Sequence, residues 1–60
     1  MNPRLLDVKQ AAAYLGTTAS VMRRLVWERK LPKFMLGQRL LFDVQDLDKF
    51  IVEEKQRQAA

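Results

Sequence analysis

Residues 7–32 read DVKQAAAYLGTTASVMRRLVWERKLP and carry two sets of helix start and stop signals. Asp7 and Gln10, three residues apart, match a capping box, in which each side chain accepts a bond from the other residue's backbone amide. Three consecutive alanines favour the helix that follows, and Gly16 is the residue type that ends helices in the left-handed conformation. These signals predict a first helix of about two turns over Val8–Leu15.

The second helix begins after a short turn. Thr18 is the expected N-cap, because its hydroxyl can accept a bond from a free amide of the first turn. The helix is expected to end near Lys30, since Leu31 precedes Pro32 and that position disfavours the helical conformation. Two short helices joined by Gly-Thr-Thr make a helix-turn-helix connection. One stripe of the second helix holds Met22, Leu25, Val26 and Arg29, and the other holds Ala19, Ser20, Arg23, Arg24 and Trp27.

A hairpin is predicted next, because the apolar segments Lys33–Leu36 and Leu40–Phe42 flank Gly37-Gln38-Arg39. A shift of one residue in its register reverses the face of every side chain. A two-residue turn places Arg39 and Leu41 on the face of Phe34 and Leu36. A three-residue loop groups Phe34, Leu36, Leu40 and Phe42 and leaves Met35 and Leu41 outside. The three-residue loop is preferred, because it does not bury Arg39.

A third helix is expected to open at Asp43, where Asp43 and Asp46 suit the positive end of the helix dipole. The tail Glu53–Ala60 is polar and lacks an apolar partner, so we expect it to fray. The predicted fold is α+β, a single domain over residues 1–60 with an ordered core at about 5–52, in the order helix, helix, strand, strand, helix. The predicted core comprises Leu6, Val8, Ala12, Leu15, Met22, Leu25, Val26, Phe34, Leu36, Leu40, Phe42, Leu47, Phe50 and Ile51.

Charge is distributed unevenly along these 60 residues, whose net charge is +4. From Ala19 to Arg39 six cations face one acid, Glu28, whereas from Asp43 to Glu54 five acids face one cation, Lys49. This asymmetry is typical of a nucleic-acid-binding protein with one working face.

The composition excludes several other kinds of site. The sequence has no cysteine and no histidine, which leaves no disulfide, no thiolate metal site and no imidazole base. No nucleophile lies beside a plausible base, so we expect no enzyme activity, no cofactor, no metal and no small-molecule substrate. The apolar runs are too short to span a membrane and the N-terminus lacks a signal-peptide pattern, so a cytoplasmic protein is expected.

The segment Leu5–Ile51 resembles the excisionase family of small winged helix-turn-helix proteins, which are related to the MerR-type DNA-binding domain. The resemblance rests on Leu5-Leu6-Asp7-Val8, Ala11-Ala12, Leu15-Gly16, Arg24-Leu25, Leu31-Pro32, Leu36-Gly37 and Asp46-Leu47, in that order. It implies that the second helix enters the major groove of double-stranded DNA and that the hairpin wing lies against the backbone or the minor groove. It also implies a role in excision of phage or mobile-element DNA, or in regulating transcription.

Given that fold, Arg24 is expected to contact guanine or a phosphate, and Arg23 a phosphate. Lys33 and Arg39 bracket the wing and are expected to neutralise phosphates. Trp27 is interpreted as a core residue that packs over the hairpin, with a contact to the sugar-phosphate backbone as the alternative. The full set of predicted DNA-binding residues is Thr18, Ala19, Ser20, Arg23, Arg24, Lys33 and Arg39.

Met35 and Leu41, together on the outer face in the preferred register, predict a protein contact. The expected partners are neighbouring copies on tandem DNA sites or an integrase. Two other functions remain open from the sequence. One is a small MerR-like transcriptional regulator, and the other is a winged-helix adaptor that binds proteins instead of DNA.

Overall fold

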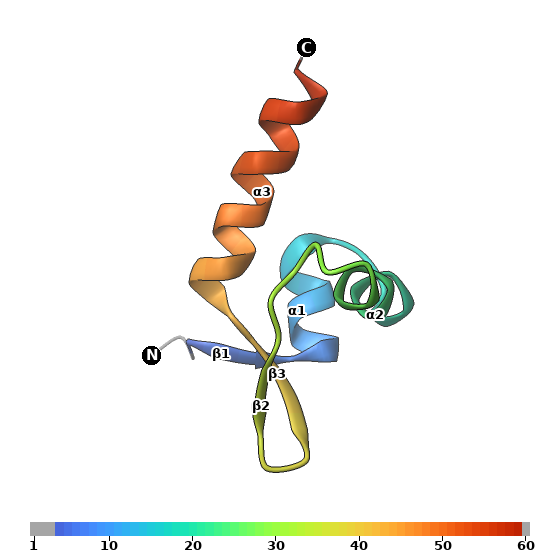
Figure 1. Ribbon diagram of the computed structural model, residues 1–60, viewed down its shortest axis with the longest axis vertical. Coiled ribbons are helices and arrows are strands. Elements are labelled where there is room, and N and C mark those ends of the chain that lie inside the picture. Colours follow the sequence, from blue (N-terminus) through green and yellow to red (C-terminus); the bar gives the residue numbers. More distant parts are fainter. Residues whose placement is uncertain (1–3, 60) are drawn as a thin grey trace.

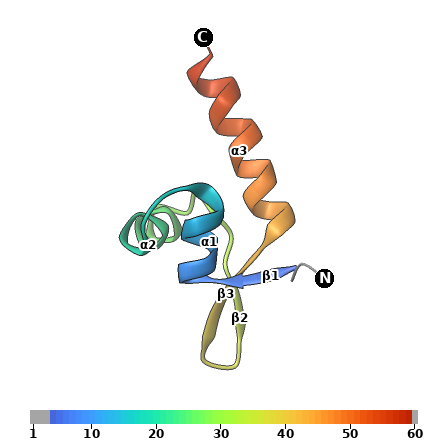
Figure 2. The same ribbon diagram turned by 180° about the vertical axis from the view of Figure 1, so that it is seen from behind.

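The computed structural model describes residues 4–59, and these form an α+β winged helix-turn-helix, as predicted (Figure 1). The hairpin and the last helix extend in opposite directions from a small central body, as both views show (Figures 1 and 2). The elements in chain order are β1 (Leu5–Asp7), α1 (Val8–Leu15), α2 (Ala19–Trp27), β2 (Phe34–Leu36), β3 (Arg39–Asp43) and α3 (Val44–Gln58).

The two caps of α1 are the ones that the sequence predicts. The Asp7 Oδ1 atom accepts a bond from the Gln10 amide at 2.7 Å, and the Gln10 side chain accepts one from the Asp7 amide at 3.1 Å. Gly16 adopts a φ of 71°, in the left-handed region. The amide of Thr17 donates to the Ala12 carbonyl at 2.8 Å, which closes a Schellman motif and turns the chain toward α2.

Helix α2 ends at Trp27, about three residues before the predicted end near Lys30. Arg29 adopts a φ of 60°, and it is the one residue other than glycine with a positive φ among those described. The Lys30 amide donates to the Leu25 carbonyl at 2.8 Å and the Arg29 amide to the Val26 carbonyl at 3.0 Å. This is the hydrogen-bond pattern of a second Schellman motif, with arginine where glycine is usual.

The sheet has three antiparallel strands in the order β1-β3-β2, and its first strand was not predicted. β1 pairs with β3 through Leu6 and Phe42, and the Val44 amide donates to the Arg4 carbonyl at 2.9 Å. The Arg4 guanidinium reaches the Asp43 carboxylate at 3.1 Å. Together with a bond from the Gln45 amide, this contact lowers the pKa of the Asp43 carboxyl from its ordinary value. β1 thus ties the start of α3 to the centre of the sheet.

The preferred hairpin register was wrong. β2 and β3 pair through Phe34 with Leu41 and Leu36 with Arg39, so the turn has two residues, Gly37 and Gln38. Among the described residues of this turn only Gly37 has a positive φ, 63°, which matches a type II′ turn. Arg39 still stays exposed, because the end of the hairpin projects past the helices (Figure 1).

This register removes the predicted outer pair of Met35 and Leu41. The two side chains lie on opposite faces of the hairpin, since Met35 pairs with Leu40 and Leu41 with Phe34. Leu41 is only 7% exposed, whereas Met35 is 51% exposed. Leu41 is therefore structural and does not form an apolar surface patch with Met35.

The core lies where α1, α2, α3 and β3 meet, and its fully buried large side chains are Met22, Phe42 and Leu47. Two predicted core residues, Phe34 and Leu36, are exposed because β2 is an edge strand beyond the helices. Ala11, Leu31 and Leu41 are buried without having been predicted. The core cluster consists of Leu6, Ala11, Ala12, Met22, Leu31, Phe42 and Leu47, with Val8, Leu15, Leu25, Val26, Leu40, Val44 and Phe50 packed against it.

Helix α3 begins after the N-cap Asp43, as predicted, and continues to Gln58 through the tail that was expected to fray. Ion pairs at helical spacing lie along the C-terminal part of α3, between Lys49 and Glu53 at 4.0 Å and between Glu54 and Arg57 at 2.6 Å. Val52 is 53% exposed, so the second half of α3 is held more by local helix contacts than by the core.

Candidate nucleic-acid interface

Helix α2 is fixed at its start by its cap and along its inner face by the core. The Thr18 Oγ1 atom accepts a bond from the Val21 amide at 3.3 Å, which confirms Thr18 as the N-cap. Met22 is fully buried against α1 and the sheet. A helix anchored on one side in this way presents its opposite side in a fixed orientation.

The opposite side of α2 carries an exposed stripe of Ser20, Arg23, Arg24 and Trp27, which we call the α2 stripe. Positions 20, 23, 24 and 27 are three or four residues apart, so they share one helix face. The interpretation of Trp27 as a core residue was wrong, because its side chain is 86% exposed. Its place in the stripe with the arginines was visible in the sequence, and the helical phase was the better guide.

A groove runs between the start of α2 and the first residues of β3, and we call it the wing groove. It brings Arg23 and Ala19 of α2 together with Arg39 of β3, three of the predicted DNA-binding residues. Lys9 of α1 also lines it and was missed, because nothing in the local sequence places α1 beside the hairpin. The lining residues are Asp7, Val8, Lys9, Ala19, Arg23, Arg39 and Leu40.

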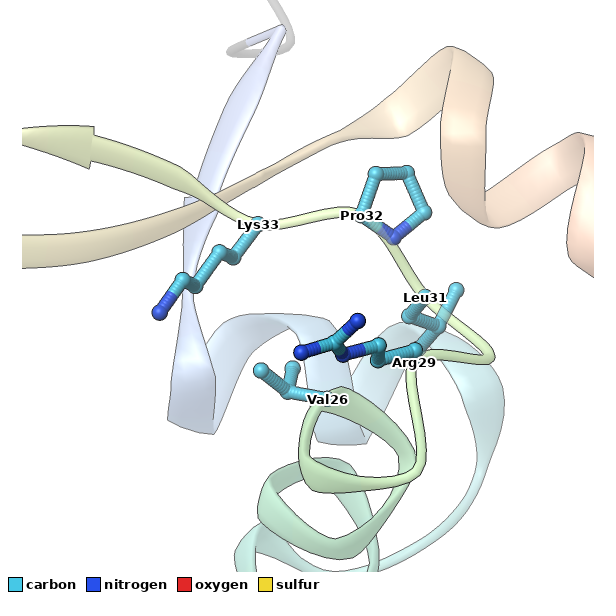
Figure 3. Close-up of a pocket in the computed structure, with 5 residues that line it drawn as sticks. All are labelled: Val26, Arg29, Leu31, Pro32 and Lys33. Carbon is cyan, nitrogen blue, oxygen red and sulfur yellow. The ribbon is translucent and has the colours of Figure 1, made fainter.

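A second hollow lies farther along α2, between its last turn and the segment that leads into β2. Arg29 and Lys33 extend their side chains in the same direction, with Val26 below them in the view (Figure 3). This hollow continues to Trp27 and Arg23, and we call that continuation the flank groove, lined by Arg23, Val26, Trp27, Arg29 and Lys33. Lys33 therefore lies here and not with Arg39, so the two predicted wing cations serve different surfaces.

The cations of these surfaces are not neutralised by neighbouring carboxylates. Within residues 4–59, the ion pairs join Arg4 to Asp43, Lys30 to Glu28, Lys49 to Glu53 and Arg57 to Glu54. None of these pairs involves Lys9, Arg23, Arg24, Arg29, Lys33 or Arg39. The one acid in either groove, Asp7, has an oxygen occupied by the cap of α1. The face formed by α2 and the two grooves is thus strongly basic, and a polyanion is the ligand that it suits.

A hydroxyl–carboxylate pair connects α1 and α3. The Tyr14 hydroxyl donates to the Asp48 Oδ1 atom at 2.6 Å, and this bond raises the pKa of the Tyr14 phenol. The pair braces the two helices and adds to the attachment of α3. Across the described residues there is no group of three or more acidic, histidine or cysteine side chains that could hold a metal, and no helix is long and apolar enough to cross a membrane.

Comparison with known proteins identifies the fold's family. The family model described as a helix-turn-helix domain matches residues 5–54, which include every helix and strand in whole or in large part. No curated protein and no solved structure matches the chain. The matched family is a DNA-binding one of excisionase type and is not known for catalysis. With its capped second helix, its basic exposed stripe and its hairpin wing, the chain belongs to the excisionase-type helix-turn-helix family of DNA-binding proteins.

Proposed function

We propose that the protein binds double-stranded DNA sequence-specifically, with α2 in the major groove and the wing beside the backbone or the minor groove. In this arrangement Arg24 reads a guanine edge and Ser20 bonds a base edge or a phosphate. Arg23 and Arg39, on the two sides of the wing groove, bond phosphates. Thr18 and Ala19 lie at the end of α2 that enters the groove, where a small side chain allows close approach.

The observation that carries this proposal is the exposed, unpaired position of Arg23 and Arg24 on a helix whose other face is locked into the core. A reading helix must hold its side chains in a defined orientation, because a bidentate contact to a base has little tolerance for displacement. The cap at Thr18 and the buried Met22 supply that orientation.

The biological role that we propose is that of an excisionase-like architectural factor of a phage or mobile element. One domain of this size contacts too little DNA for high affinity alone, so we expect several copies to bind repeated sites cooperatively. Neighbouring copies or an integrase are the proposed protein partners, and no chemical step is assigned to the chain itself.

A protein-binding adaptor is the second candidate, and the exposure of β2 favours it. Phe34, Met35 and Leu36 are 46%, 51% and 58% exposed on an edge strand, which is an unusual run of apolar surface. The basic α2 stripe has no evident use in such an adaptor, which is why DNA binding is the principal proposal.

Selection from a library of random DNA duplexes tests the proposal. The full chain should enrich a short consensus, and it should bind the enriched duplex more tightly than a shuffled duplex of the same composition at the same salt. Two copies of the consensus at a suitable spacing should bind cooperatively. Failure to enrich any sequence, with equal weak binding to all duplexes, would contradict sequence-specific recognition and would leave the adaptor as the better function.

A further inference from the structure

We propose that the flank groove, resting on the DNA-binding function proposed above, is a second contact site that holds a sugar-phosphate backbone segment of the bound duplex. In it Trp27 packs on a deoxyribose while Arg29 and Lys33 bond the adjoining phosphates. The proposed function assigns no role to Trp27 or Arg29, so this site extends the surface that contacts DNA.

Trp27 is the first observation. An indole buries a large apolar area when it packs, so leaving it 86% exposed sacrifices that stabilisation in the free protein. It lies one helical turn after Arg23, on the same face, and both side chains line the flank groove. An exposed aromatic ring beside unpaired arginines is a typical anchor for a partner with both apolar and anionic parts. The DNA backbone alternates apolar sugars and anionic phosphates.

The charge of the groove is the second observation. Its lining contains three cations, Arg23, Arg29 and Lys33, and no acid. Glu28, the nearest acid in sequence, faces Lys30 at 3.6 Å and does not line the groove. Three unneutralised cations within one small hollow repel one another, and a phosphate between them would relieve that repulsion.

The backbone of Arg29 is the third observation. Its φ of 60° places the backbone in the left-handed region. That region is unfavourable for residues with long side chains and is adopted mainly by glycine, asparagine and aspartate. Glycine would end α2 with the same Schellman bonds and without that strain. Arginine at this position therefore costs stability, and its side chain lines both hollows beside Lys33 (Figure 3). Strain kept at one residue is a reason to look for a function of its side chain.

Continuity with the reading helix identifies the occupant as the same duplex. Arg23 lines both grooves, the wing groove beside the start of α2 and the flank groove beside its end, so the two surfaces are continuous along one side of the helix. A backbone strand at the edge of a major groove occupied by α2 would pass the C-terminal half of that helix, where Trp27 and Arg29 lie. A single strand with unpaired bases could also stack on Trp27, and the experiment distinguishes this case.

Trp27 is the only tryptophan in the chain, so its fluorescence reports directly on the groove. The full chain is titrated with the selected duplex while fluorescence anisotropy of a dye on the DNA measures binding. We expect the tryptophan emission to shift and saturate with the same dissociation constant as the anisotropy. Saturated anisotropy with an unchanged tryptophan spectrum would overturn the site and leave the proposed function intact. Absence of duplex binding would overturn both.

Two substitutions separate binding from stability. Arg29→Gly should raise the thermal unfolding midpoint, because it relieves the positive φ, and yet weaken duplex binding about fivefold to tenfold. It should also reduce the slope of log affinity against log salt by about one. Trp27→Ala should leave the unfolding midpoint nearly unchanged and weaken binding by about fivefold or more. Lys55→Ala, which removes one exposed cation from α3, is the matched control and should change neither quantity much.

Opposite movement of stability and affinity in Arg29→Gly is the decisive result. If Arg29→Gly raised the unfolding midpoint with affinity and salt slope unchanged, Arg29 would be a helix end and nothing more. If the tryptophan emission responded to a single strand of the selected sequence but not to the duplex, the groove would bind unpaired bases, and the duplex backbone would be the wrong ligand.

Discussion

Arg23 and Arg24 are neighbours in the chain, but their side chains point to different parts of the surface of α2. Arg23 lines both grooves, whereas Arg24 is exposed on the α2 stripe and lines neither. In the proposed complex, Arg23, which lines both grooves, meets backbone strands, and Arg24, on the open face, meets base edges. Phosphate contacts position a protein on DNA, while base contacts carry the sequence information.

Arg24→Ala should therefore cost about 1–3 kcal/mol on the selected duplex and much less on a shuffled one. Arg23→Ala should weaken both duplexes to a similar extent. Isotherms on the two duplexes at one salt concentration measure both effects, with Lys55→Ala as a control for loss of one charge. If Arg24→Ala left the ratio of the two affinities unchanged, α2 would not be reading bases through this residue.

At the same scale, the exposure of Trp27 shows where composition misleads. Tryptophans of small domains are mostly buried, and that tendency led to the expectation of a core residue. The helical phase already grouped Trp27 with Ser20, Arg23 and Arg24, and phase determines which side of a capped helix meets solvent. Arg29 is a different case, because its left-handed conformation follows from the Schellman bonds and arginine gives no sequence signal for it.

At the scale of elements, the register of the hairpin has a direct test. In the observed register Leu41 is buried and Met35 is exposed on the other face. Leu41→Lys should destabilise the fold by about 2 kcal/mol or more, because it places an ammonium at a buried apolar position. Met35→Lys should change the free energy of unfolding by about 0.5 kcal/mol at most. Chemical denaturation of the two variants measures both values.

The two substitutions distinguish the registers, because a hairpin with a three-residue loop would have both side chains facing outward. Both substitutions would then change the free energy of unfolding by similar, small amounts. Equal, small effects of Leu41→Lys and Met35→Lys would restore that register. They would also restore the outer apolar pair as a candidate contact with a neighbouring copy.

Local sequence signals predicted the helices and the hairpin, whereas features set by contacts between distant residues could not be predicted. The capping box of Asp7 and Gln10, the left-handed Gly16 and the Thr18 cap are each written within four residues, and each is present. β1 is three residues long and exists through pairing with a strand more than 30 residues away, so no local pattern indicates it. The prediction of the hairpin register depended on whether Arg39 would be buried. Its burial depends on how far the hairpin projects beyond the helices. The same limit hid Lys9, whose place in the wing groove is set by the packing of α1 beside β3.

At the scale of the whole molecule, positive charge is concentrated in one part of the shape. Unpaired cations gather on α2 and the two grooves, whereas α3, which projects away from the body, carries four acids and three cations and is close to neutral (Figure 1). This distribution gives the molecule a preferred orientation as it approaches a polyanion, with α3 turned away.

Affinity for DNA should consequently fall linearly with salt on logarithmic axes. The unpaired cations suggest roughly three to six phosphate contacts, for a slope of about −3 to −5. Titrations of the selected duplex from low to moderate salt measure this slope, and the shuffled duplex provides the comparison. An isotherm that stayed the same across the salt range would show that the basic face does not meet phosphates.

The early end of α2 also limits how much a single copy can specify. A helix of nine residues is about 13 Å long, which matches the rise of about four base pairs. Because four kinds of base pair are distinguishable in the major groove, a given sequence of four base pairs recurs by chance about once every 250 base pairs. One bound copy therefore carries too little information to mark a locus in a genome. If α2 reads base pairs as proposed, a unique site requires several such four-pair sequences in a defined number, order and spacing, and Arg29, at the end of α2, helps to set the length of each one.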